Sequence, residues 1–162
     1  MSAGMKTLPY ETATAGDRAL QELQRVLQGF GCQNFGTMID NERQVVIVAF
    51  KWRERQVHME ASWRGYAMAW TKRHPWSRQS RLTRPDYDRR ALAQGRVSVC
   101  SVLRDWVKAQ TVAIECGILQ FEEVFMPHML LPDGRRVIQA AREAKVLPQI
   151  SHEDQKIVEL KL

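Results

Sequence analysis

The stretch QVVIVAFKW, residues 44–52, decides the fold class. It is nearly continuously apolar and rich in β-branched side chains, as is typical of a strand at the buried centre of a small sheet. Turn-forming residues flank it at Asp40–Asn41 and at Arg53–Arg55. We therefore expect strands at 34–39, 44–52 and 56–63. Because the connections between them are short, the three strands should be antiparallel.

The third of these stretches shows which face of the sheet is buried. Its apolar and polar side chains alternate, so successive residues should point to opposite faces. The expected core face carries Val57, Met59, Ala61 and Trp63. The expected solvent face carries His58, Glu60 and Ser62.

An amphipathic helix is expected before the strands, over about residues 15–29, where apolar side chains recur at helical spacing. Thr14 and Asp17 resemble a capping box that would begin it. Gly29 and Gly31 would end it. The first nine residues read as a flexible leader.

Further helices are expected after the strands. Ser62 can cap a short helix to about Lys72. Pro85 suits the first turn of a long helix over about 86–116, with Gly95 as a point where it could bend. FEEVF at 121–125 and the segment 135–145 predict two short C-terminal helices.

The pattern as a whole predicts an α+β fold. A three-stranded antiparallel sheet should pack against the N-terminal helix and the long central helix, both on one face. Residues 1–148 should form a single domain, with 149–162 as a C-terminal tail.

Composition favours an ordinary globular protein. Of 162 residues, 44% are apolar and 26% are charged, so a packed core is expected. The three cysteines, Cys32, Cys100 and Cys116, have no metal-ligand spacing and read as reduced, buried thiols. No apolar run suits a signal peptide or a membrane span. We expect a cytoplasmic protein that has no membrane partner.

The charge is unevenly distributed. The net charge is +6, yet twelve basic and four acidic residues lie between Lys51 and Arg96, which gives that segment +8 and leaves −2 for the rest. Within it, WSRQSRLTR at 76–84 has no acid and no periodicity, which predicts an exposed basic loop. Such asymmetry suggests a surface that meets a polyanion.

Cations interleaved with aromatic residues suit single-stranded nucleic acid, because guanidinium groups follow phosphates while aromatic faces stack on bases. Trp63, Tyr66, Trp70 and Trp106 read as packing residues, whereas Trp76 lies in the basic loop and is a candidate for stacking. The candidate nucleic-acid contacts are Lys72, Arg73, Trp76, Arg78, Arg81, Arg84, Arg89 and Arg90. The same arginines could instead form an ordinary solvated face or bind an acidic protein, although only Asp86 and Asp88 lie near enough in sequence to neutralise them.

The sequence contains no catalytic signature. Glu115, Glu122, Glu123 and His128 are residue types that could bind a divalent cation, but their spacing matches no metal or acid–base template. The four histidines are scattered, and there is no P-loop, nucleophile elbow or dinucleotide motif. We expect no enzyme activity, no metal and no cofactor.

The segment LRDWVKAQTVAIECGILQFEEVFMPHMLLPDGRRV, residues 103–137, resembles the C-terminal portion of small, mostly uncharacterised proteins encoded by tailed phages and prophages. That resemblance implies a phage or prophage setting. The order of three strands followed by a helix is also similar to the core of single-strand annealing proteins, which is an analogy of fold alone.

Two functions follow from these observations. The first is a non-enzymatic nucleic-acid-binding protein, favouring single-stranded DNA, in phage replication or recombination. The alternative is a phage inhibitor or adaptor that places its basic face on an acidic surface of a host protein, such as a defence complex. Either is compatible with a homo-oligomer.

Overall fold

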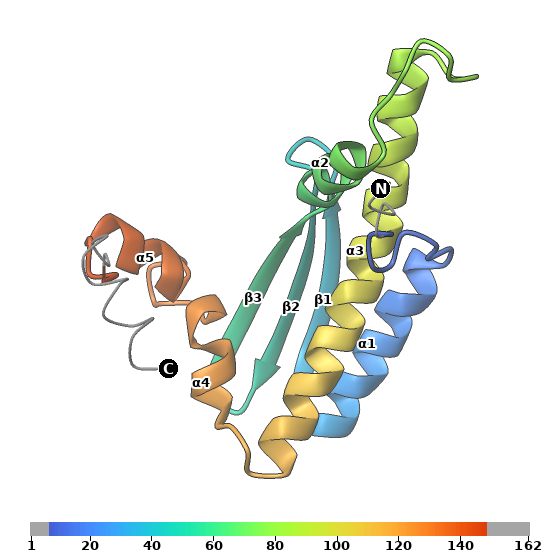
Figure 1. The fold of residues 1–162 in the computed structure, drawn as a ribbon. Helices are drawn as coiled ribbons and strands as arrows, with labels where there is room; N and C mark the ends of the chain where they lie inside the picture. The colour runs from blue at the N-terminus through green and yellow to red at the C-terminus, as the bar shows by residue number, and fades with distance from the viewer. Residues whose placement is uncertain (1–6, 149–162) are drawn as a thin grey trace, which may run out of the picture.

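The computed structural model describes residues 7–148 and has the predicted α+β architecture (Figure 1). In chain order the elements are α1 (Gly16–Phe30), β1 (Gln33–Asp40), β2 (Val45–Trp52), β3 (Arg55–Ser62), α2 (Trp63–Arg73), α3 (Arg84–Glu115), α4 (Phe121–Phe125), the 3₁₀ helix η1 (Met126–His128) and α5 (Val137–Glu143). The predicted tail, 149–162, lies outside the described residues.

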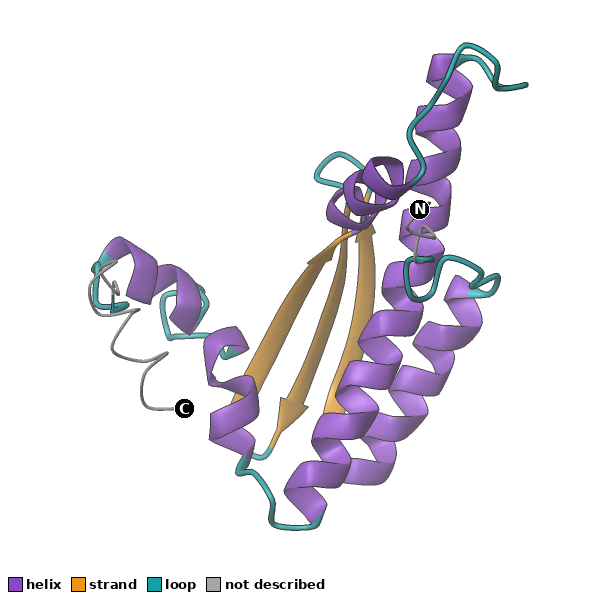
Figure 2. Cartoon of the chain, viewed as in Figure 1, coloured by secondary structure: helices purple, strands orange, loops and turns teal. Residues whose placement is uncertain are grey.

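The sheet is three-stranded and antiparallel in the order β1-β2-β3, as predicted. Helices α1 and α3 lie side by side across one face of it (Figure 2). Val46, Val48 and Phe50 of β2 enter the core with Leu23 of α1 and Val107 of α3. The alternation predicted for β3 is confirmed, because Val57 and Met59 are buried while His58 and Glu60 remain partly exposed.

The start of α1 differs from the prediction. Ala15 is the N-cap residue, and no side chain caps this end, so the expected Thr14–Asp17 capping box does not form. At the other end the helix passes through Gly29. It stops at Gly31, which adopts the left-handed conformation with φ 96° that glycine accepts without strain.

A segment before α1, residues 7–15, lies along α2 and α3 and is called the strap here. Tyr66 donates its hydroxyl hydrogen to the carbonyl of Pro9 at 2.6 Å, and Ser98 donates to the carbonyl of Tyr10 at 2.8 Å. Gln94 donates to the carbonyl of Ala13 at 2.9 Å. The prediction of a flexible leader is therefore wrong for Thr7–Pro9, and residues 1–6 lie outside the described part.

Helix α3 runs unbroken through Gly95, where the sequence suggested a bend. A methyl group placed on Gly95 would lie 2.6 Å from the carbonyl oxygen of Trp63 and 3.3 Å from the amide nitrogen of Ala67. The missing side chain thus lets the first turns of α2 approach the backbone of α3. Pro85 stands in the first turn of α3 as predicted, and Thr83 is its N-cap.

The C-terminal elements complete the core and cover one edge of the sheet. Phe121 and Phe125 of α4 are buried, and Phe121 stacks on Trp52 with ring centroids 4.1 Å apart. Residues 129–131 run beside β3, where the Leu130 N–H donates to the Gln56 carbonyl at 2.9 Å. They form a hairpin with residues 135–137, so α5 begins later than the predicted residue 135.

The cysteines are free, as predicted, but only two of them are buried. Burial raises the pKa of Cys32 to about 12 and also raises that of Cys100. Cys116 is exposed, contrary to the prediction, because it follows the last turn of α3, where the chain leaves the core.

Candidate nucleic-acid interface

The first turns of α3 and the loop before them extend beyond the sheet at the end where α2 lies (Figure 1). Residues 72–90 form this feature, called the basic protrusion here. It contains seven cations and two carboxylates, a formal net charge of +5. All of the predicted contact residues lie on it: Lys72, Arg73, Trp76, Arg78, Arg81, Arg84, Arg89 and Arg90.

The loop of the basic protrusion is closed by its own contacts. Trp76 donates its indole N–H to the carbonyl of Leu82 at 2.9 Å, which spans the loop. Ser80 N–H donates to the Ser77 carbonyl at 2.9 Å, and the buried Tyr87 donates its hydroxyl hydrogen to the carbonyl of His74. The cations at 78 and 81 are therefore displayed on a constrained loop.

Two of the seven cations pair with the two carboxylates, in agreement with the prediction that only Asp86 and Asp88 lie near enough to neutralise any of them. Arg84 lies 3.2 Å from Asp88, and Arg89 pairs with Asp86. A hydrogen bond from Thr83 and the charge of Arg89 hold the pKa of Asp86 below its usual range. Exposed pairs of this kind contribute little to stability and can exchange for a phosphate.

Four cations of the basic protrusion are exposed and have no ion pair among the residues that the structure describes. They are Lys72, Arg78, Arg81 and Arg90. Arg73 is also exposed, and it donates to the carbonyl of Thr7 at 3.1 Å in the strap. The four unpaired groups can neutralise phosphates without giving up an internal contact.

The fold separates the basic segment, residues 51–96, into two surfaces, whereas the sequence suggested a single one. Lys51, Arg53 and Arg55 lie at the β2–β3 turn, a full eight-residue strand away from α2, which is roughly 26 Å. There Arg55 pairs with Glu122 at 3.0 Å, and Arg53 lies over Trp52, 4.3 Å from the ring centroid. The candidate interface is therefore confined to the basic protrusion.

Most of the aromatic residues in this segment are packing residues, as predicted. Trp63 is buried, and Trp70 contacts the rings of His74 and Tyr87 at centroid distances of 4.9 and 5.4 Å. Trp76 is half-buried, with the Arg84 guanidinium 6.0 Å from its ring centroid. Trp76 is thus a partly exposed indole beside Arg84, an arginine that pairs with Asp88.

Of the four residues considered for a cation, Glu115 is exposed, and the other three have contacts elsewhere. Glu122 pairs with Arg55, and Glu123 accepts a hydrogen bond from the Gln120 N–H at 2.6 Å. His128 packs against Trp106, and burial lowers its pKa, with a smaller contribution from Arg136. Within residues 7–148, no three residues of metal-ligating type gather into a site.

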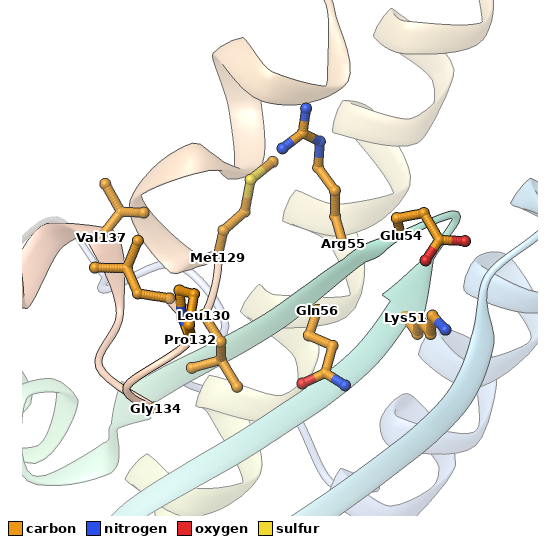
Figure 3. Close-up of a pocket in the computed structure, with 10 residues that line it drawn as sticks. Lys51, Glu54, Arg55, Gln56, Met129, Leu130, Pro132, Gly134 and Val137 are labelled. Carbon is orange, nitrogen blue, oxygen red and sulfur yellow. The ribbon is translucent and has the colours of Figure 1, made fainter.

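A cleft of about 590 Å³ lies between the β2–β3 turn and the C-terminal hairpin (Figure 3). Its walls combine apolar side chains such as Leu130 and Val137 with the charged ends of Lys51 and Glu54. The lining contains neither a histidine nor a cysteine. The cleft lies at the opposite end of β3 from the basic protrusion and is not part of the candidate interface.

Comparison of the chain with protein-family models, curated proteins and solved structures finds no match. The resemblance to tailed-phage proteins thus stays a prediction. In the part of the chain that the structure describes, no helix combines the length and apolarity needed to cross a bilayer.

Proposed function

We propose that this protein binds single-stranded nucleic acid, with single-stranded DNA favoured, through the basic protrusion. Its role is binding rather than catalysis, in a phage or prophage replication or recombination module. The observation that carries the proposal is a set of four exposed cations on one projecting feature, none of which has an ion pair within residues 7–148: Lys72, Arg78, Arg81 and Arg90.

The binding is mainly ionic. Each phosphate that a cation neutralises releases condensed counterions, so affinity falls as salt rises. Arg84 and Arg89 add contacts when they exchange their carboxylates for phosphates, and Asp86 and Asp88 oppose that exchange. Contacts to the phosphate backbone of a nucleic acid do little to distinguish one base sequence from another.

The preference for single strands follows from Trp76. An indole face can stack on a base only when that base is not already stacked inside a duplex, and such a contact is worth about 1–3 kcal/mol. Trp76 is held in place through its N–H bond to Leu82, which leaves its ring plane fixed beside Arg84. A single accessible indole gives a modest preference, with the ionic contacts providing most of the affinity.

The test is a titration of labelled oligonucleotides, single-stranded and double-stranded, at several salt concentrations. Changing Arg78→Ala or Arg81→Ala should flatten the dependence of log affinity on log salt by about 0.7 for single strands. Arg53→Ala is the matched control, because Arg53 is an exposed arginine at the far end of the sheet and should leave the slope unchanged.

The melting temperature of each variant serves as the folding control. If neither kind of oligonucleotide binds at low salt, the proposal is wrong, and an acidic protein becomes the better partner for the basic protrusion. An equal effect of Arg53→Ala and Arg78→Ala would show that net charge, and not the basic protrusion, governs binding.

A further inference from the structure

One edge of the sheet is covered and the other is not. At the β3 edge, residues 129–131 lie along the strand, and the Leu130 N–H donates a hydrogen bond to the outward carbonyl of Gln56. At β1, no strand pairs with the outer edge among the described residues. Five of its eight residues are exposed, which are Gln33, Asn34, Gly36, Thr37 and Met38.

This free edge lacks the side chains that usually protect an edge strand. Charged residues, lysine above all, and proline normally block pairing with another chain. The β1 sequence QNFGTMID contains no lysine, arginine or proline, and its one charge is Asp40 at the end. A bulge interrupts the ladder between Gln33 and Gly36, whereas Gly36–Asp40 pair regularly with β2.

The outward backbone groups of β1 follow from the ladder. Trp63 N–H donates to the Gln44 carbonyl at 3.1 Å, which makes these two residues a hydrogen-bonded pair next to β2 and β3. Bonded and non-bonded pairs alternate, so the odd-numbered residues of β2 direct their backbone groups to β1. Their partners are Gly36, Met38 and Asp40. The N–H and C=O groups of Thr37 and Ile39 therefore point out to the free edge.

We propose that a second copy of this chain pairs with β1 in antiparallel orientation about a twofold axis. In the register that uses only the regular part of the strand, Thr37 pairs with Ile39 of the second copy, and Ile39 with its Thr37. Two pairs of this kind satisfy all the outward groups of these residues, with four hydrogen bonds. The result is a continuous sheet in the order β3-β2-β1-β1-β2-β3.

Side chains in this register fit one another. Met38, which is 55% exposed, meets Met38 of the second copy at the axis and is covered by it. Each Asp40 lies opposite Gly36, so the two carboxylates stand at opposite ends of the contact. A parallel arrangement would bring the two Asp40 side chains together, and like charges side by side are unfavourable.

The mass of the protein in solution, measured by light scattering over a dilution series without nucleic acid, tests the proposal. The unaltered chain should show twice the chain mass of 18.8 kDa. Met38→Lys should shift it to a single chain mass, because two lysines would meet at the axis. Met68→Lys is the matched control, since Met68 is 63% exposed and lies on α2 and not on the sheet, and it should leave the dimer intact.

A cross-link tests the register independently of the lysine variant. Met38→Cys, combined with Cys116→Ser to remove the exposed thiol, should form a disulfide dimer on mild oxidation, because Met38 occupies a non-bonded pair with Cα atoms about 4.5 Å apart. A single chain mass at every concentration, or a dimer unaffected by Met38→Lys, would overturn the proposal. Absence of the cross-link in a confirmed dimer would overturn the register.

Discussion

Gly95 shows how one missing side chain sets the position of α2. The carbonyl of Trp63 occupies the space that a methyl group on Gly95 would need, at 2.6 Å. Gly95→Ala should therefore destabilise the protein by about 1–3 kcal/mol, because the clash is with backbone atoms that cannot rotate away. Chemical denaturation measures this loss.

Gly29→Ala is the control for that change. Gly29 lies near the end of α1, and nothing stands within 4 Å of the position that a methyl group would take there. Alanine at this residue should be neutral or should stabilise the helix by up to about 1 kcal/mol. Equal effects of the two substitutions would contradict the role assigned to Gly95.

Glu11 links the strap to the start of the basic protrusion and should respond to pH. Its carboxylate lies 3.0 Å from His74 Nε2 and accepts the Leu8 N–H at 3.0 Å. These two hydrogen bonds lower the pKa of Glu11 below its ordinary value of 4.5, and the one from His74 has the larger effect. Because its pKa is lower in the folded state, the ionised Glu11 carboxylate stabilises the fold above pH 4.5. This contribution is lost as the pH falls through the lowered pKa.

Glu11→Gln isolates that contribution. The melting temperature of the variant should be lower than that of the unaltered protein at neutral pH. The difference should shrink below pH 4.5, where Glu11 of the unfolded chain takes up a proton, and should vanish below the lowered pKa, where the folded chain does so too. A difference that stays constant across this range would show that the charge of Glu11 has no part in holding the strap.

At the scale of elements, the short helix α4 contributes two large buried side chains, Phe121 and Phe125, to the core. Phe125 contacts the rings of Phe50 and Trp106 edge-on, with centroids 5.5 and 5.8 Å away. Phe125→Ala should cost about 3–5 kcal/mol because it leaves a cavity between β2, α3 and α4. Met126→Ala, at a residue that is 52% exposed, should stay within about 0.5 kcal/mol. Similar losses from both, measured by denaturation, would mean that α4 packs only loosely.

The elements themselves could largely be predicted from the sequence, because their signals are local. The β-branched run of β2, the alternation in β3 and the proline at the start of α3 each indicate an element without knowledge of its neighbours. The capping box at Thr14 failed for a physical reason. The Ala13 carbonyl next to it is bound to Gln94 of α3, so tertiary contacts fix the chain there.

The contacts of the candidate site could be predicted only in part. The grouping of residues 72–90 is local in sequence and follows from the pattern of charges. The separation of Arg53 and Arg55 from that group depends on the direction of β3, and the anchoring of Trp76 depends on the bond to Leu82 that closes the loop. Neither carries a sequence pattern of its own.

At the scale of the whole molecule, the two ends of the sheet differ in charge. One end of the sheet carries the basic protrusion, with a formal +5, while at the other end Arg55 is paired with Glu122 of α4. A dimer joined through β1 would turn the two sheets end for end, so that the two protrusions would lie at opposite ends of a six-stranded sheet. One dimer would then bind two separate stretches of a nucleic-acid strand, which raises avidity without any new type of contact.

The salt dependence of single-strand binding by the unaltered protein tests the central claim most directly. The four cations without an ion pair among the described residues, each neutralising one phosphate, predict that log affinity for a labelled oligo-dT falls against log salt with a slope of at least about −2.8, at about −0.7 per contact, and any contacts from Arg84 and Arg89 would steepen it. Fluorescence anisotropy at several salt concentrations measures this slope. A slope indistinguishable from zero, or no binding at low salt, would contradict the account.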